Sequence, residues 1–247
     1  MKYEKQVFKA KFVKRYKRFF TDVEIDGEVV VAHCPNTGSM KTCIDDDIDC
    51  IVTYQDDPKR KLKYTLEWTK PGKSWCLVNT GIPNKLAYEL WESGENKKWK
   101  KFDRCATEVK LNQATRADLV MWNSKDYDGK KPKPQDFIDN PVFHIVEVKN
   151  TTLRVDGQAR FPDGVTTRGQ KHLQELMDFI DLGNTSELLF CVSRNDVDSF
   201  SPAGDMDPKY AELFYQAKKH GVVMSPFMVE FKGKKEVRLT TEKLKIK

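Results

Sequence analysis

Two short acidic segments in the second half of this chain carry the residue types that metal-assisted hydrolysis needs. Asp118 stands at the start of one apolar segment, and Glu147-Val148-Lys149 closes another. Alternate residues of a strand project to the same face, so Glu147 and Lys149 should point together while Val148 packs behind them. Two carboxylates from adjacent strands can share one hard cation, with the Val148 carbonyl as a further oxygen ligand.

This arrangement suits hydrolysis of a phosphodiester bond. A Mg²⁺ or Mn²⁺ ion held by Asp118 and Glu147 would neutralise the charge that develops on the phosphate and would lower the pKa of its bound water. Lys149 could orient that water or help to deprotonate it. Glu108, ten residues before Asp118 and expected at the end of a helix, is a candidate third carboxylate. The competing interpretation is a surface ion pair, because charged triplets are common at strand ends.

A helix expected over residues 168–180 follows these strands. Apolar residues recur at i, i+3, i+4 and i+7 from Leu173, and Thr167 with Gln170 fits a capping box. Gln170 lies three residues before Leu173, on the apolar side, so we expect it to face the sheet rather than water. Capping alone is the alternative, and the two roles can coexist. Of the four histidines, only His172, beside Gln170, lies near this candidate site.

The N-terminal segment is a candidate nucleic-acid contact. Residues 1–18 carry eight Lys or Arg and a single acid, whereas the whole chain has a net charge of only +6. The cations that crowd together there, beside aromatic side chains that can stack on bases, are Lys14, Arg15, Lys17 and Arg18. Arg15 is the first choice for a phosphate contact, since a planar guanidinium suits a phosphate better than an ammonium does. The competing interpretation is a solvated strand edge.

Two further polar segments could meet a phosphate. Pro35-Asn36-Thr37-Gly38 could present backbone N–H groups, with Asn36 and Thr37 as contacts, although the same tetrapeptide fits an ordinary turn. Asp163-Gly164, followed by Arg168, could form a loop beside the metal site, and the alternative is simply the entry to the helix.

Composition excludes several classes of protein. With 39% hydrophobic residues the chain can build a core, and no apolar run approaches the roughly 18 residues needed to span a bilayer. The first residues lack the apolar region of a signal peptide, so we expect a cytoplasmic protein without membrane contact. The six cysteines form no C-x-x-C pair, which favours small buried side chains over a zinc site. A homodimer is compatible with the sequence.

Residues 1–80 have the pattern of a small β-barrel, with the OB-fold as the obvious candidate. Phe8, Ala10 and Phe12 alternate with lysines, and Asp26-Gly27 is a strong hairpin signal. The expected strands cover about residues 7–12, 20–25, 28–33, 48–54, 62–69 and 75–78.

Residues 81–247 alternate between helix and strand patterns, which predicts an α/β domain with a mixed sheet. The last helix is well marked, with Asp207 as N-cap, Pro208 at its first position and Gly221 after its end. Residues 123–141, rich in Lys, Asp and Pro, should leave the sheet as an excursion. The expected helices cover residues 84–91, 168–180 and 208–220, and the expected strands 117–122, 142–149, 187–193 and 222–231.

Asp118, Glu147-Val148-Lys149 and the helix carrying Gln170 resemble the core of the PD-(D/E)xK nuclease superfamily. From about Phe12 to Pro226, the chain also resembles the bacterial and archaeal sugar fermentation stimulation protein family (SfsA). The motifs that carry this resemblance are Arg15-Tyr16-Lys17-Arg18-Phe19, His33-Cys34-Pro35-Asn36-Thr37-Gly38, Phe161-Pro162-Asp163, Arg168-Gly169-Gln170-Lys171-His172-Leu173 and Phe200-Ser201-Pro202.

The resemblance implies an OB-like nucleic-acid-binding domain joined to a nuclease-like domain, DNA binding without strong sequence preference, and a regulatory link to sugar (maltose) use. It also implies metal ligation by Asp118 and Glu147, water positioning by Lys149 and supporting roles for Glu108 and Gln170. The long segment 123–141 departs from the tighter hairpin expected between the two acids, which puts substrate access in question.

We therefore expect a Mg²⁺- or Mn²⁺-dependent nuclease that acts on DNA or RNA. The alternative is a non-enzymatic, sequence-nonspecific DNA-binding regulator of sugar metabolism. The intact carboxylates and lysine favour the enzyme, because a site without chemistry has no need for clustered acids near an anionic ligand.

Overall fold

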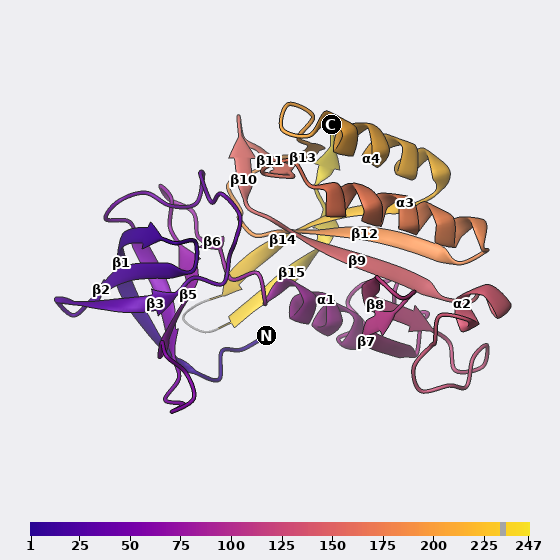
Figure 1. Ribbon diagram of the computed structural model, residues 1–247, viewed down its shortest axis with the longest axis horizontal. Helices are drawn as coiled ribbons and strands as arrows, with labels where there is room; N and C mark the ends of the chain where they lie inside the picture. Colours follow the sequence, from indigo (N-terminus) through magenta and orange to yellow (C-terminus); the bar gives the residue numbers. More distant parts are fainter. Residues whose placement is uncertain (233–235) are drawn as a thin grey trace.

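The computed structural model describes residues 1–232 and 236–247, which form a β-barrel beside an α/β domain (Figure 1). The barrel strands are β1 (Gln6–Tyr16), β2 (Phe20–Ile25), β3 (Glu28–His33), β4 (Asp49–Tyr54) and β5 (Tyr64–Thr69). They follow the order β3-β2-β1-β4-β5, and a parallel pairing of β3 with β5 closes the barrel. A short strand, β6 (Cys76–Leu77), pairs with the end of β5 in antiparallel orientation. The expected OB-type barrel is confirmed.

The local patterns account for these strands. Ala10 and Phe12 are buried in β1, while the lysines between and beside them are exposed, as the alternation predicts. Asp26 and Gly27 have φ angles of 51° and 86° and join β2 to β3. Two central residues with positive φ match the right-handed twist of paired strands, so the predicted hairpin forms.

The α/β domain is built on a six-stranded mixed sheet, as expected. Its strands, in spatial order, are β15 (Glu236–Lys243), β14 (Val223–Lys232), β12 (Thr185–Val192), β9 (His144–Thr151), β8 (Arg116–Trp122) and β7 (Arg104–Lys110). The central strands β14, β12 and β9 run parallel, and the outer pairings are antiparallel. A smaller sheet contains β10 (Leu153–Val155), β11 (Gln158–Phe161), β13 (Ser199–Pro202) and β16 (Lys245–Ile246).

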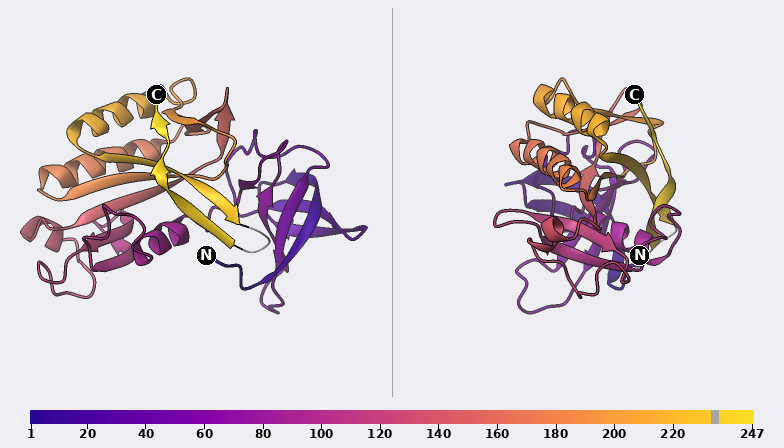
Figure 2. Two further views of the ribbon diagram at one scale, coloured as in Figure 1. Left: turned by 180° about the vertical axis from the view of Figure 1, so that it is seen from behind. Right: turned by 90° about the vertical axis from the view of Figure 1, so that its right-hand side faces the viewer.

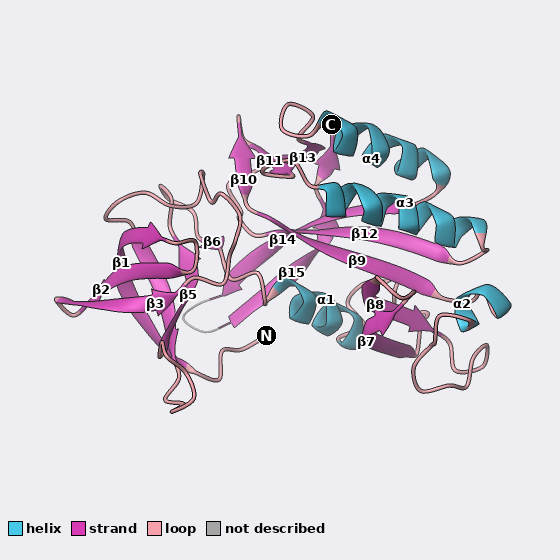
Figure 3. Cartoon of the chain, in the orientation of Figure 1, coloured by secondary structure: helices cyan, strands magenta, loops and turns pink. Residues whose placement is uncertain are grey.

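Helices cover both faces of the large sheet. The helices α3 (Thr167–Asp181) and α4 (Pro208–His220) lie side by side on one face, and α1 (Pro83–Glu92) lies on the other (Figures 1 and 2). The four helices of the described residues, including the short α2 (Asp136–Asp139), belong to the α/β domain (Figure 3). Over the described ranges, none of them is long and apolar enough to cross a membrane.

The helix ends confirm one prediction and overturn another. Asp207 caps α4 by accepting a hydrogen bond from the backbone N–H of Tyr210, as expected. In α3 the N-cap is Thr166, whose hydroxyl accepts from the Gly169 N–H, so the predicted capping box of Thr167 and Gln170 is wrong. The cap lies one residue earlier because Thr166 has the extended backbone that an N-cap needs.

Glu108 lies within strand β7 and not at the end of a helix, so that expectation is also wrong. Strand β7 is an edge strand with mostly exposed side chains, and it therefore shows little of the apolar pattern by which a strand is predicted. The excursion over residues 123–141 forms only α2 and folds back along β7. Lys131 donates to the backbone oxygen of Thr107 (2.7 Å), and the Ser124 N–H donates to the Asp103 carboxylate (2.7 Å).

A shared core fixes the barrel to the α/β domain. Trp68 and Leu77 from the barrel belong to the same buried cluster as Leu189 of the α/β domain. The centroids of the Trp68 and Phe231 rings are 4.8 Å apart. Arg194, only 3% exposed, donates to backbone oxygens on both sides of the junction, those of Thr42 and Thr152 (both 3.0 Å). The two domains therefore share one buried cluster, while the barrel also has a core of its own.

Candidate functional site

The two predicted metal ligands meet where strands β8 and β9 separate. The strands pair from Met121 opposite His144 to Leu119 opposite Val146, and the paired residues end one step before the two acids. In the gap, Asp118 Oδ2 accepts a hydrogen bond from the Val148 N–H (2.7 Å). Asp118 Oδ1 accepts another from the Asn84 side chain in the first turn of α1 (2.7 Å). The Asp118 carboxylate thus takes the place of a backbone partner on β8 for Val148, the residue next to Glu147.

Glu147 and Lys149 lie on the same face of β9, as their spacing predicts. Lys149 Nζ is 2.5 Å from Glu147 Oε1, while Val148 is buried in the core on the other face. The Nδ1 of His172, from α3, contacts the same Glu147 oxygen and lies 3.1 Å from Lys149 Nζ, and its Nε2 accepts from Arg168 Nε (3.3 Å). Among the described residues, Glu147 Oε2 accepts no hydrogen bond.

Burial and mutual repulsion set the charge states of the two acids. Burial, and then the negative charge of Glu147, raises the pKa of Asp118 to about 6. Burial also acts to raise the pKa of Glu147, but the hydrogen bond from His172 and the charge of Lys149 outweigh it and lower that pKa. At neutral pH both groups are therefore ionised, and Asp118 carries its charge at a cost in free energy. A cation between them would remove this cost.

The donor set fits a hard divalent cation. Glu147 Oε2, the Asp118 carboxylate and the Val148 carbonyl are all oxygen ligands, which Mg²⁺ and Mn²⁺ prefer. Over residues 1–232 and 236–247, no group of three or more His, Cys, Asp or Glu side chains is disposed around one point. Two carboxylates with water completing the shell is nevertheless a common way to hold Mg²⁺.

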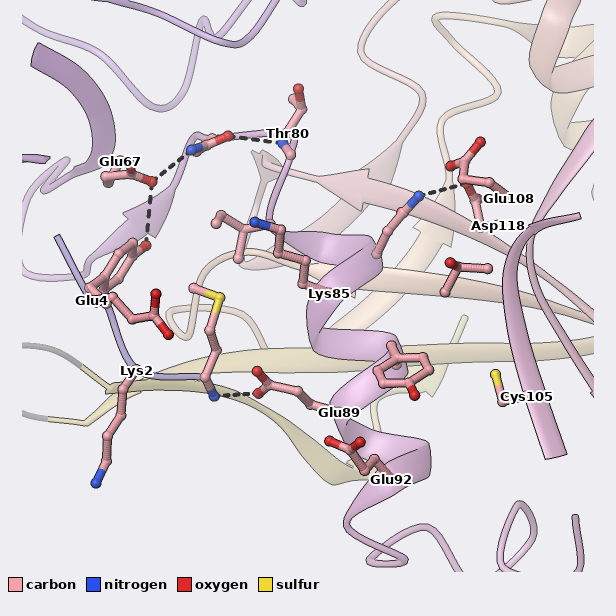
Figure 4. Close-up of a pocket in the computed structure, with 18 of the residues that line it drawn as sticks. Lys2, Glu4, Glu67, Thr80, Lys85, Glu89, Glu92, Cys105, Glu108 and Asp118 are labelled. Carbon is pink, nitrogen blue, oxygen red and sulfur yellow. Dashed lines mark hydrogen bonds and ion pairs between the residues drawn. The ribbon is translucent and has the colours of Figure 1, made fainter. Parts of the chain in front are cut away.

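Asp118 opens onto a cleft of about 1140 Å³ between the barrel and the α/β domain (Figure 4). Glu108 faces Asp118 across the β7–β8 pair, since Thr107 pairs with Leu119 on one side and Val109 with Ala117 on the other. Figure 4 shows these two acids together at one end of the cleft and the buried Glu67 of the barrel at the other. Lysines also line the cleft, among them Lys85 and Lys131.

Gln170 does not reach the carboxylates. Its amide donates to both oxygens of Asp207 (2.9 and 3.0 Å), the residue that caps α4. It therefore braces α3 against α4 and supports the site only through the placement of α3.

The two polar loops contact each other. Asn36 is buried, and its side chain bonds the backbone of Val78 and of Gly38. Ser39 donates from its N–H and its hydroxyl to Asp163 (2.9 and 3.0 Å). A Cβ on Gly38 would meet Asp163 at 2.8 Å, which explains the glycine. Of this tetrapeptide's two candidate contacts, only Thr37 is exposed.

The basic residues of the N-terminal segment divide into two kinds. Arg15 donates to the backbone oxygens of Asn36 (2.6 Å), Gly38 (3.0 Å) and Arg18 (3.0 Å), so its guanidinium is committed to holding the loop. Lys17 and Arg18, with φ angles of 48° and 63°, form the exposed turn between β1 and β2.

The residues flanking this turn place an aromatic and a further cation beside it. Phe19 is 48% exposed. Lys14 is exposed and lies 3.5 Å from the Asp22 carboxylate. Arg168 is exposed at the start of α3. The available cations are thus Lys14, Lys17, Arg18 and Arg168.

Sequence reasoning missed the partners that come from distant segments. Asn84 reaches Asp118 from the first turn of α1, and no motif in the sequence marks it. His172 was noted only as a neighbour of Gln170, yet its ring and not the Gln170 amide contacts Glu147. The one available signal that His172 faces the sheet was its helical spacing from the apolar position 176, four residues later.

The fold and the site define a protein with an OB-type barrel and an α/β domain that holds a carboxylate pair. Comparison with known family models agrees with this architecture. The model of the SfsA N-terminal OB domain matches residues 13–78, and that of the sugar fermentation stimulation protein RE domain matches residues 81–235. The chain therefore belongs to the sugar fermentation stimulation protein (SfsA) family.

Relatives match along almost their entire length. A sugar fermentation stimulation protein homolog of Pelagibacter ubique is 42% identical, with 100% of this chain and 99% of the relative covered. Another from Bdellovibrio bacteriovorus is 40% identical, with 93% of each covered. The solved structure of Pyrococcus furiosus SfsA in complex with Ca²⁺ has a TM-score of 0.82 at 22% identity, covering 100% of this chain and 98% of that one. That likeness is one of fold.

The raised pKa of Asp118 predicts that this acid destabilises the metal-free fold. The folded state binds the proton more tightly than the unfolded chain, so stability falls as the pH rises from about 4 to about 6. Asp118→Asn removes the charge, and the Asn84 amide can rotate to accept from the new side chain. In EDTA at about pH 7.5, urea denaturation should show the variant more stable by about 2 kcal/mol, with the difference shrinking towards pH 4.

Glu108→Gln, at an exposed acid, is the control and should change the free energy of unfolding little. A variant no more stable than wild type at the higher pH would contradict the assignment.

The hydrogen bonds of Arg15 predict that its replacement lowers the stability of the fold, whereas replacement of Lys17 does not. Arg15→Ala removes three charge-assisted hydrogen bonds to backbone oxygens, so we expect a loss of about 2 kcal/mol in the free energy of unfolding. Lys17→Ala, at the exposed turn, should change it by less than about 0.5 kcal/mol. Urea denaturation of both variants measures the difference. Equal stabilities would show that Arg15 does not hold the loop.

Proposed function

We propose that this protein is a divalent-metal-dependent nuclease that hydrolyses phosphodiester bonds of DNA or RNA. The observation that carries the proposal is the proximity of Asp118, Glu147 and Lys149 at the separated ends of β8 and β9, with Asp118 on the wall of an open cleft. Two ionised acids that repel one another in a partly buried site are poorly suited to a structural role, but they suit a cation and an anionic substrate.

Asp118, Glu147 and the Val148 carbonyl would hold Mg²⁺ or Mn²⁺. The bound ion supplies charge neutralisation at the phosphate and an activated water. Lys149, fixed 2.5 Å from Glu147, keeps that carboxylate ionised and holds an ammonium group where it can orient the water. Glu108 can receive further cations or water, because it faces Asp118 across the cleft wall. The complex of the Pyrococcus furiosus protein with Ca²⁺, another oxygen-seeking cation, supports a metal in this fold.

The barrel would bind the nucleic acid. In OB-folds the loop between the first two strands belongs to the oligonucleotide-binding face. Here that loop carries Lys17, Arg18 and the half-exposed Phe19, which together offer phosphate contacts and a stacking surface. The Asn36 loop packs next to it, since Cys34 donates to the backbone oxygen of Phe19, and leads through Asp163 towards Arg168. Lys17 and Arg18 on the barrel and Arg168 at the start of α3 would thus be phosphate contacts at the two ends of this path.

Cleavage of labelled nucleic acid tests the enzymatic part of the proposal. Single- and double-stranded DNA and RNA should be cut with Mg²⁺ or Mn²⁺ and remain intact in EDTA. Asp118→Ala and Glu147→Ala should abolish cutting, because each removes an oxygen ligand. Lys149→Ala should slow it about 100-fold or more while metal binding persists, since lysine is not a ligand. Glu212→Ala, at an exposed acid on α4, is the matched control.

Two results would count against this proposal, the first against the assigned site and the second against an enzyme. Undiminished cutting by Glu147→Ala would show that another site, or a contaminant, does the chemistry. Tight DNA binding with no cutting under any metal condition would favour the non-enzymatic regulator.

A salt titration of binding tests the basic surface. Replacing both Lys17 and Arg18 with Ala, in EDTA to prevent cutting, should weaken binding to any sequence. The slope of log K against log salt should fall by about 0.7 to 0.9 for each lost phosphate contact. Base preference should barely change, because phosphate contacts carry no direct sequence information. The charge-matched control replaces Lys218 and Lys219 at the end of α4. Identical lines for wild type and the Lys17/Arg18 variant would make this turn a solvated surface only.

A further inference from the structure

His172 is a buried side chain at the carboxylate pair to which the proposed reaction gives no task. It projects from α3 towards the sheet and is only 6% exposed. Its Nδ1 contacts Glu147 Oε1, and its Nε2 accepts a hydrogen bond from Arg168 Nε at 3.3 Å. Lys149 Nζ also lies 3.1 Å from Nδ1, so the ring, the lysine and the carboxylate form one cluster. With Nε2 accepting from Arg168, we assign the ring proton to Nδ1, where it can be donated to the carboxylate.

The two oxygens of Glu147 are therefore unequal. Oε1 receives both His172 and Lys149, whereas Oε2 accepts no hydrogen bond within the described ranges. Two donors on one oxygen stop the carboxylate from rotating and leave the other oxygen free. Groups that orient a ligand in this way affect metal affinity although they never touch the metal.

Arg168 holds His172 from the opposite side. Only its Nε is engaged, and the rest of the guanidinium makes no hydrogen bond in the part of the chain that the structure describes. The first turn of α3 is itself fixed, by the Thr166 cap and by the bond from Gln170 to Asp207. A short connected path thus runs from an exposed cation, through a buried ring, to the carboxylate.

We propose that His172 is a positioning residue that orients the Glu147 carboxylate for a divalent cation, and that Arg168 keeps His172 in place. The inference rests on the proposed metal-dependent function, and it assigns no catalytic contact to either residue. The rival explanation is that His172 and Glu147 form an ion pair that only stabilises the fold. The two explanations differ in what they predict for metal affinity.

Mn²⁺ binding, measured by calorimetry without nucleic acid, separates them. His172→Leu replaces the ring by an apolar side chain of similar length and removes both ring nitrogens. We therefore expect Mn²⁺ to bind about 10- to 100-fold more weakly. His172→Asn should retain affinity within about threefold, because its amide nitrogen can take the position of Nδ1. His172→Gln should bind more weakly than His172→Asn, since its longer side chain carries the amide towards the position of Nε2. Urea denaturation of each variant reports stability separately.

Arg168 has a matched control on the same helix. Arg168→Ala should weaken Mn²⁺ binding several-fold, whereas Lys171→Ala should leave it unchanged. Lys171 carries the same charge three residues further along α3, but its ammonium group lies 3.5 Å from the Glu175 carboxylate and does not contact His172.

The outcomes are distinguishable from failure of the proposed function. Wild-type protein that neither binds Mn²⁺ nor cuts nucleic acid would overturn that function itself. If wild type binds Mn²⁺ and His172→Leu binds it equally well, the positioning role is overturned. If His172→Leu does not fold, equal affinities of the Asn and Gln variants overturn it instead. Equal effects of Arg168→Ala and Lys171→Ala would remove Arg168 from the path.

Discussion

Glu147 is a carboxylate at 7% exposure, and such a group stays ionised only if nearby donors compensate for the water it has lost. Lys149 and His172 provide that compensation on a single oxygen. Burial, and then the negative charge that they preserve, raises the pKa of Asp118, which accepts hydrogen bonds from Asn84 and the Val148 N–H. The site therefore holds more negative charge than its own cations neutralise. This imbalance depends on the placement of α3 and on the separation of β8 from β9, so much of the α/β domain serves to maintain it.

The barrel takes part in the same arrangement because it shares an interior with the α/β domain. Trp68 and Leu77 are buried among residues of the large sheet, and Arg194 ties the junction through backbone oxygens. A separate contact joins Ser39 to Asp163, close to the start of α3. The positively charged residues of the barrel consequently have different roles, structural in one case and available for binding in others. Arg15 is committed to a loop, whereas Lys17 and Arg18 remain available at a turn.

Local patterns predicted the fold well, and contacts between distant segments largely escaped prediction. The hairpin at Asp26-Gly27 and the cap of α4 depend on residues within four positions of one another, so their signals lie side by side in the sequence. The common face of Glu147 and Lys149 follows from the period of a strand alone.

Other features depend on tertiary structure. His172 reaches Glu147 across 25 positions and Asn84 reaches Asp118 across 34, and no local period encodes either contact. Strand β7 was missed because an exposed edge strand has little apolar alternation. The commitment of Arg15 could not be foreseen, because the acceptors of its hydrogen bonds are backbone oxygens that every sequence possesses.

The excursion over residues 123–141 has a consequence beyond access to the cleft. Strand β7 is the outermost strand on its side of the large sheet, and an open edge can pair with another chain and lead to aggregation. Here Lys131 donates to the backbone oxygen of Thr107, and exposed charges at Arg104 and Lys110 stand at the two ends of the strand. The segment that lengthens the path between the two acids thus also protects the sheet from edge-to-edge association. Shortening it to widen the cleft would expose that edge.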